Sequence, residues 1–220
     1  EEPWSILDYA HSRAESLGSS TFTITNLISE EEGKSGGSGK KAVARLKWAN
    51  VGDSGVKVFR YGSVVSASAV QEHYFNCPRQ LGNPKKVREC DTPDAAEEDE
   101  VALRRGDVVV LATDGVFDNV FDKEISELVN KHKKRSAGEI AEAIARRAST
   151  NSRNRKYESP FAKEAYALEK KEGGGGAVLT LGGGGLSLNG IFSDLGLVKE
   201  ENPYIGGKLD DITCVVAVVK

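Results

Sequence analysis

The sequence has no methionine and only three cysteines in 220 residues, and both scarcities limit what the protein can be. Because the chain starts with glutamate, we expect its natural N-terminus to lie upstream, so this start carries no information about a targeting segment. The cysteines, Cys77, Cys90 and Cys214, are odd in number and lack CxxC spacing. We therefore expect reduced, mostly buried thiols, which suit an intracellular protein.

Long apolar runs and an excess of basic residues are also missing. No apolar run approaches the ~20 residues needed to cross a bilayer, so we expect no membrane insertion. The formal net charge of −3 provides no positive field for nucleic acid, which we exclude as a partner. With 39% hydrophobic and 29% charged residues, the composition is typical of a soluble globular protein, and the length suits a single domain over 1–220.

Predicted strands dominate the first half of the chain. Apolar residues at helical spacing predict one helix over 3–17, which Gly18 ends. β-branched and alternating segments predict four strands, at 21–28, 42–51, 56–61 and 64–67. We expect Gly62 and Ser63 to form the hairpin loop between the last two. The charged and Gly/Ser-rich segment 30–41 is interpreted as a flexible, solvated loop.

Predicted helices dominate the second half. Amphipathic spacing predicts three of them, at 122–133, 137–149 and 160–171, and Asp122 and Ser136 are suitable N-caps for the first two. The segment 173–202 contains two four-glycine blocks and is interpreted as a mobile, glycine-rich insert. A last strand follows at 212–219. Strands in the first half and at the end, with helices between them, predict an α+β fold of packed sheets with helices outside.

The most informative stretch is an apolar run that ends in an aspartate. Residues 108–112 are typical of a short strand buried on both faces, and Asp114 follows at its exit. Near the end of the chain, Asp210 and Asp211 directly precede the predicted strand 212–219. If the two strands lie side by side, their carboxylates face a common point, which is the geometry that a hard divalent cation needs.

Each aspartate also has a purely structural explanation. Asp114 and the glycine after it form a common hairpin signal, although the following residues are typical of a helix start that would bring Asp118 to the same place. Asp210 and Asp211 suit a solvated strand start, and Asp53 suits the tight turn that Gly-Asp-Ser-Gly forms. Spacing alone therefore leaves both the metal site and the structural explanation open.

Six segments, taken together and in order, resemble the signatures of a known enzyme family. VGDSG at 51–55, ATDGVFD at 112–118 and DDIT at 210–213 are similar to motifs of the metal-dependent serine/threonine phosphatases, the protein phosphatase 2C family. Finer segments resemble its organellar branch, mitochondrial or plastid: QEHYFN at 71–76, YESPFA at 157–162 and GGK at 206–208. Any one of these motifs is weak evidence, but all six in order make a strong match over most of the chain.

The resemblance implies an α/β/β/α four-layer sandwich with a two-metal centre at one end. Asp114 and Asp210 would be direct ligands of Mg²⁺ or Mn²⁺. Asp53 and Asp118 would lie beside them and serve a third, more weakly held ion.

Asp211 and Gly115 would support the ligands without binding the ions themselves. The resemblance further implies that the ions activate water, which hydrolyses phosphomonoesters on phosphorylated protein substrates. No residue of this chain is then expected to act as a catalytic acid or nucleophile.

One part of the family pattern has no match. The chain contains a single Asp-Gly, at 114–115, so the upstream aspartate that bridges both ions in the family has no counterpart. The family's phosphate-binding arginine and general-acid histidine also lack matches. The chain therefore resembles the C-terminal two-thirds of a phosphatase domain, incomplete at its N-terminus.

A non-catalytic pseudophosphatase, or a fragment that binds a partner through the sandwich, is the alternative function. The retention of Asp53, Asp114, Asp118 and Asp210 favours the enzyme. We expect a monomer. The branch resemblance indicates mitochondria or plastids as the compartment, with the cytoplasm as the alternative.

Overall fold

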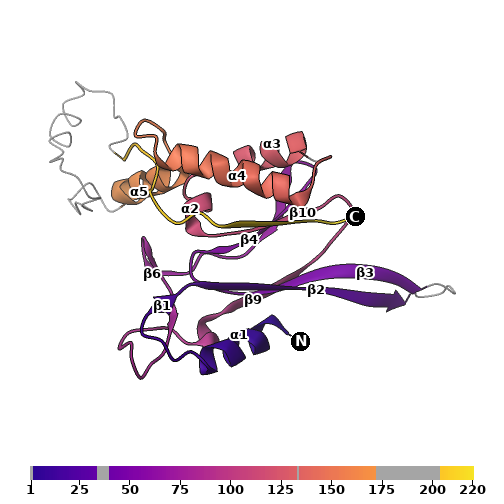
Figure 1. Ribbon diagram of the computed structural model, residues 1–220, viewed down its shortest axis with the longest axis horizontal. Coiled ribbons are helices and arrows are strands. Elements are labelled where there is room, and N and C mark those ends of the chain that lie inside the picture. Colours follow the sequence, from indigo (N-terminus) through magenta and orange to yellow (C-terminus); the bar gives the residue numbers. More distant parts are fainter. Residues whose placement is uncertain (1, 34–39, 133, 172–203) are drawn as a thin grey trace.

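The computed structural model describes residues 2–33, 40–132, 134–171 and 204–220 as two facing antiparallel sheets with helices outside them (Figure 1). The helices are α1 (Pro3–Ser12), α2 (Asp114–Phe117), α3 (Asp122–His132), α4 (Ala137–Ser152) and α5 (Pro160–Lys171). The strands are β1 (Ser19–Ser20), β2 (Phe22–Gly33), β3 (Lys40–Val51), β4 (Gly55–Arg60), β5 (Ser63–Ala67), β6 (Glu72–Tyr74), β7 (Cys77–Pro78), β8 (Leu81–Gly82), β9 (Glu97–Ala102), β10 (Val108–Ala112) and β11 (Cys214–Val218). Among these residues, no helix has the length and apolar character to cross a membrane.

The main elements form four layers, which confirms the predicted α/β/β/α sandwich. One sheet has the strand order β2-β3-β9, and the other has the order β11-β10-β4-β5. Helix α1 covers the outer face of the first sheet, and α3 and α4 cover the outer face of the second (Figure 1). The innermost core lies between the sheets, where Trp48 of β3 and Val58 of β4 are each 1% exposed.

Strand β10 is buried on both faces, as its apolar run predicts. Val108 and Val110 pack with α3 and α4, whereas Val109 points into the core between the sheets. This alternation follows from the two-residue period of a strand. On either side β10 pairs with β4 and β11, so its backbone is hydrogen-bonded on both edges.

Strand β11 is less buried than its apolar sequence predicts. Its residues alternate between half-buried and exposed, and Val215 is 57% exposed. Only β10 flanks it within the part of the chain that the structure describes.

The structure corrects the boundary of the predicted loop at 30–41. Strand β2 continues to Gly33 and β3 begins at Lys40, so both ends of that segment belong to one long hairpin. Ser29 pairs with Ala44 and Gly33 with Lys40, because the register set by the apolar residues nearer the core simply continues outward. The rest of the predicted loop, 34–39, and the predicted insert 173–202 lie outside the described residues.

Three smaller predictions are also corrected. The β4–β5 loop is Tyr61-Gly62, one residue earlier than expected, and both residues have positive φ, as a tight two-residue hairpin requires. Asp122 lies within the first turn of α3 rather than at its N-cap, whereas Ser136 caps α4 in a full capping box, as predicted. The three cysteines are free but half-buried rather than buried.

Candidate metal centre

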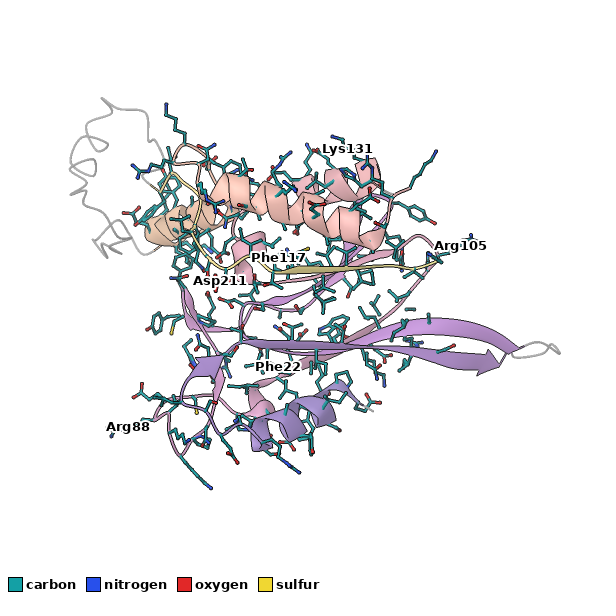
Figure 2. The ribbon with its side chains drawn as sticks, viewed as in Figure 1. Phe22, Arg88, Arg105, Phe117, Lys131 and Asp211 are labelled. Atoms are coloured by element: carbon teal, nitrogen blue, oxygen red, sulfur yellow. The ribbon has the colours of Figure 1, made fainter. Side chains whose placement is uncertain are left out.

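The antiparallel pairing of β10 with β11 brings two distant aspartates to one end of the sheet. The last residue of β10 pairs with the first residue of β11. Just beyond this pair, the Thr113 hydroxyl donates a hydrogen bond to the Asp211 carbonyl at 2.7 Å. Asp114 therefore leaves β10 at the same edge at which Asp210 enters β11. Figure 2 shows Asp211 at this end of the sheet, beside Phe117 of α2.

The short helix α2 places Asp118 one turn beyond Asp114. The Asp118 N–H donates to the Asp114 carbonyl at 2.7 Å, and the Gly115 N–H donates to Asp114 Oδ1 at 2.8 Å. A Cβ at Gly115 would collide with the Asp211 carbonyl, so only glycine fits where the segment before β11 crosses the helix start. Gly115 and Asp211 thus touch the site through their backbones, and the Asp211 side chain is exposed.

The ammonium group of Lys208 lies among three of the predicted carboxylates. Its Nζ is 2.8 Å from Asp114 Oδ2, 2.7 Å from Asp118 Oδ2 and 3.5 Å from Asp210 Oδ2. Because Asp114 and Asp210 both reach one nitrogen atom, their carboxylates converge although 96 positions separate them in the chain. The geometry expected from the sequence is present, and the role of these carboxylates as metal ligands stays a prediction.

Asp53 approaches the cluster from the turn between β3 and β4. Glycine precedes it with a φ of +101°, and a Cβ at this Gly52 would lie 2.7 Å from the Arg79 carbonyl. The turn therefore depends on glycine. The charge of Asp53 contributes to raising the pKa of Asp118.

Burial and like charge set the protonation of the cluster. Burial raises the pKa of Asp118 to about 6, against the opposing effect of the Lys208 ammonium. Burial also raises the pKa of Asp53, and the Asp114 carboxylate adds to that rise. Burial alone would lower the pKa of Lys208, but the carboxylates of Asp118 and Asp114 outweigh it and raise that pKa. The ammonium of Lys208 therefore opposes, but does not outweigh, the effect of burial on Asp118 and Asp53.

The cluster fits a hard divalent cation in the kind of ligand but not in number. Carboxylate oxygens are the ligands that Mg²⁺ and Mn²⁺ prefer, and three of them already face one positive charge. Within the described ranges, however, no group of three or more His, Cys, Asp or Glu side chains is arranged to hold a metal ion. The described residues therefore provide at most part of the oxygen ligand set that such a cation needs.

Sequence reasoning missed two residues of the site, Lys208 and Asn119. Asn119 is fully buried, and its side chain bonds both backbone groups of Lys208: Nδ2 donates to the Lys208 carbonyl at 2.8 Å, and the Lys208 N–H donates to Oδ1 at 2.9 Å. Lys208 is the last residue of the GGK segment at 206–208, and Asn119 directly follows the ATDGVFD segment at 112–118. The available signal was an Asn one residue after the DGVFD motif and a Lys two residues before an aspartate, and neither predicts a contact across 89 positions.

Comparison with known proteins identifies the family. No protein-family model matches the sequence. The chain is 36% identical over 218 residues to "Probable protein phosphatase 2C 26" of Arabidopsis thaliana, an alignment that covers 99% of this chain and 60% of that protein. It is 33% identical over 219 residues to "Probable protein phosphatase 2C 1" of Oryza sativa subsp. japonica, covering 100% of this chain and 54% of that protein.

A solved structure supports the same conclusion. The photosystem II phosphatase PBCP is 32% identical and superposes with a TM-score of 0.70 over 99% of this chain and 71% of that chain. The two structures share the layered sandwich, so this chain has the fold of these phosphatases. The chain belongs to the protein phosphatase 2C family, which confirms the resemblance seen in its motifs. It spans 60% or less of the length of the curated relatives named above.

Proposed function

We propose that the protein containing this chain is a Mg²⁺- or Mn²⁺-dependent protein serine/threonine phosphatase. The observation that carries the proposal is the convergence of Asp114, Asp118 and Asp210 on one cationic nitrogen at the end of β10 and β11. Family membership and the curated relatives support it. The substrates are phosphorylated proteins, and the reaction is hydrolysis of a phosphomonoester.

The proposal assigns Asp114 and Asp210 as direct ligands of the ions. When bound, the ions neutralise the charge of the phosphate group and lower the pKa of a water molecule that attacks phosphorus. The task of this chain is to hold the carboxylates still. The Thr113–Asp211 hydrogen bond and the close approach of Gly115 to the Asp211 carbonyl fix the two loops to one another.

The ligand set of this chain is incomplete, and the proposal assigns the missing donors to sequence outside it. The curated relatives are longer, so a further aspartate that bridges the two ions has room in the whole protein. With Asp114 and Asp210 alone, we expect weak binding of metal, because hard cations need six or more oxygen ligands. Asp53 and Asp118 are proposed to serve a third, weakly held ion.

The test is release of phosphate from a phosphoserine or phosphothreonine peptide by the full-length protein. We expect activity that needs Mn²⁺ or Mg²⁺, is abolished by a chelator, and falls by at least ~100-fold, or about 2.7 kcal/mol, in Asp114→Asn. The matched control is Asp122→Asn, which removes a carboxylate that pairs with Lys57 outside the cluster. Activity of Asp114→Asn equal to that of the control would contradict the proposal.

The second candidate function is that of a pseudophosphatase that binds a partner. It is favoured by one observation: the described residues alone provide no group of three carboxylates ready to hold metal. The result that would support it is a folded full-length protein that releases no phosphate, whether Mn²⁺ or Mg²⁺ is present or not.

The compartment and the oligomeric state are further parts of the proposal. We propose a plastid or mitochondrial location, supported by the branch motifs and by the similarity to a photosystem II phosphatase. Imaging a fluorescent fusion of the full-length protein tests it, and exclusion from both organelles would contradict it. A monomer is expected in sedimentation analysis.

A further inference from the structure

Lys208 forms the ion pairs that a bound cation would form at the same place. Its Nζ is within hydrogen-bond distance of one oxygen each from Asp114 and Asp118 and is 3.5 Å from Asp210. Two of the three N–H donors of the ammonium are therefore hydrogen-bonded to carboxylates, and the carboxylate of Asp210 is a further ion-pair partner. Only 15% of the side chain is exposed.

The backbone of Lys208 is held so that the side chain reaches this point. Both its N–H and its carbonyl are bonded to the buried side chain of Asn119, and that side chain also donates to the Gly115 carbonyl at 2.9 Å. On the other side, a Cβ at Gly207 would collide with the Asn151 carbonyl. The segment therefore lies pressed against the helices, and Lys208 is fixed relative to α2 and its aspartates.

The ring of Phe161 also helps to define the position of the ammonium. Nζ lies 5.1 Å from the centre of the Phe161 ring, in the range of a cation–π contact. Phe161 is 7% exposed, and its N–H donates to the Asp118 carbonyl at 3.2 Å. A ring tied to the backbone of Asp118 thus supports the same cation that the Asp118 side chain binds.

A metal ion and this ammonium would compete for the same two oxygens. Mg²⁺ binds at about 2.1 Å from a carboxylate oxygen, and Nζ already lies at 2.7 and 2.8 Å from Asp118 Oδ2 and Asp114 Oδ2. Two positive charges that close together repel each other, so the ammonium opposes binding of a cation to those oxygens.

We propose that Lys208 is a tethered substitute for the weakly held third metal ion: its ammonium takes the place between Asp114 and Asp118, and it lowers the affinity of that place for divalent cations. The inference rests on the proposed function, because it assumes that the other ions bind nearby. It revises one part of that function, because it names a residue of the chain, rather than a third ion, as the resident charge beside Asp118.

The experiment counts Mn²⁺ bound to the full-length protein by equilibrium dialysis and follows its affinity by calorimetry. We expect Lys208→Met to bind one more Mn²⁺ per molecule than the wild type, or to bind its weakest Mn²⁺ at least about tenfold more tightly. Adding Asp118→Asn to Lys208→Met is expected to remove that gain. Lys57→Met is the matched control, because Lys57 pairs with Asp122 outside the cluster.

A second readout separates charge from structure. In a chelator, Lys208→Met leaves the carboxylates without their counter-charge, so we expect a lower melting temperature than that of the wild type, restored by millimolar Mn²⁺. Lys208→Arg keeps the charge and is expected to keep the wild-type number of bound ions. A purely structural lysine would lose stability in a way that Mn²⁺ does not restore.

The outcomes distinguish this inference from the proposed function. If the wild type and Lys208→Met bind equal numbers of Mn²⁺ with equal affinity, the inference is wrong and the proposed function stands. If neither protein binds Mn²⁺, both are wrong. An extra ion in Lys208→Met that persists when Asp118→Asn is added would also overturn the inference, because the ion would then lie elsewhere.

Discussion

The two ends of strand β10 carry aspartates in opposite electrostatic states. At its start, Asp107 is 1% exposed and paired with Arg60, and at its exit Asp114 and Asp118 share one lysine with Asp210. Figure 2 shows these ends far apart, with Arg105 near the first and Asp211 at the second. The same residue type therefore serves a structural purpose at one end and a proposed chemical purpose at the other.

Every oxygen of Asp107 has a donor. Arg60 donates from Nε to Oδ1 at 2.8 Å and from Nη2 to Oδ2 at 2.7 Å, and the Arg104 N–H donates to Oδ2 at 2.7 Å. Burial by itself would raise the pKa of Asp107, but these hydrogen bonds outweigh it and hold the pKa below its ordinary value. A carboxylate whose charge is compensated in this way stabilises the fold.

The carboxylates at the exit of β10 are under-compensated. Burial raises the pKa of Asp118 to about 6 even with Lys208 beside it. Burial removes the carboxylates at both ends from water, so the difference lies in the partner charge. Asp107 has the guanidinium of Arg60 to itself, whereas three carboxylates at the exit share one ammonium.

The largest expected effect on stability is at the start of β10, where Arg60 pairs with Asp107. Arg60→Met leaves the buried Asp107 charge without its partner, so we expect the free energy of unfolding to fall by about 3–5 kcal/mol. Denaturant unfolding of the full-length protein measures it. Arg146→Met, which breaks an exposed pair with Glu142, should cost less than about 1 kcal/mol. Equal losses in both variants would show that the buried Arg60–Asp107 pair matters no more for stability than an exposed pair.

The pH dependence of Asp107→Asn is the next expected effect. Because the folded pKa of Asp107 is lowered, its carboxylate adds stability above the unfolded pKa of about 3.9, and that stability is lost as pH falls through the folded pKa. We expect the variant to be about 3 kcal/mol less stable at pH 7 and the difference to shrink below pH 4. Urea unfolding at a series of pH values checks this. A difference that grows on acidification would contradict it.

Removal of the Asn119 side chain tests the connection between the helices and the Lys208 segment. Asn119→Ala leaves backbone groups of Lys208 and Gly115 without partners, and we expect a loss of about 2 kcal/mol. Asn154→Ala is the control, since its side chain accepts from the exposed Lys156 N–H. Thermal unfolding compares the two, and a loss no greater than that of the control would show that the connection is not needed.

The smallest expected effect has the opposite sign. In the metal-free protein, Asp118→Asn removes one charge from a cluster in which burial disfavours it, so we expect a gain of about 1 kcal/mol in stability at pH 7. The same change at Asp107 is destabilising. Unfolding in a chelator measures both variants side by side. Destabilisation by Asp118→Asn would mean that Lys208 fully compensates the cluster.

The sequence predicted local patterns well and long-range pairings poorly. The apolar run 108–112 and the Asp-Gly after it identify a strand and its exit because both signals lie within a few neighbouring residues. The hairpin of β2 and β3 was cut short because its charged, Gly/Ser-rich end is typical of a loop, whereas strand register extends it. Lys208 was missed because Asn119, which fixes its backbone, is 89 positions away.

The account's central claim is that the carboxylates at the exit of β10, and not that of Asp107 at its start, bind metal. The most direct test is a calorimetric titration of the full-length protein with Mn²⁺ in the wild type, Asp114→Asn and Asp107→Asn, all at 25 °C and checked for folding. We predict that Asp107→Asn binds Mn²⁺ like the wild type and that Asp114→Asn binds it at least about tenfold more weakly. Wild-type binding by folded Asp114→Asn would contradict the claim.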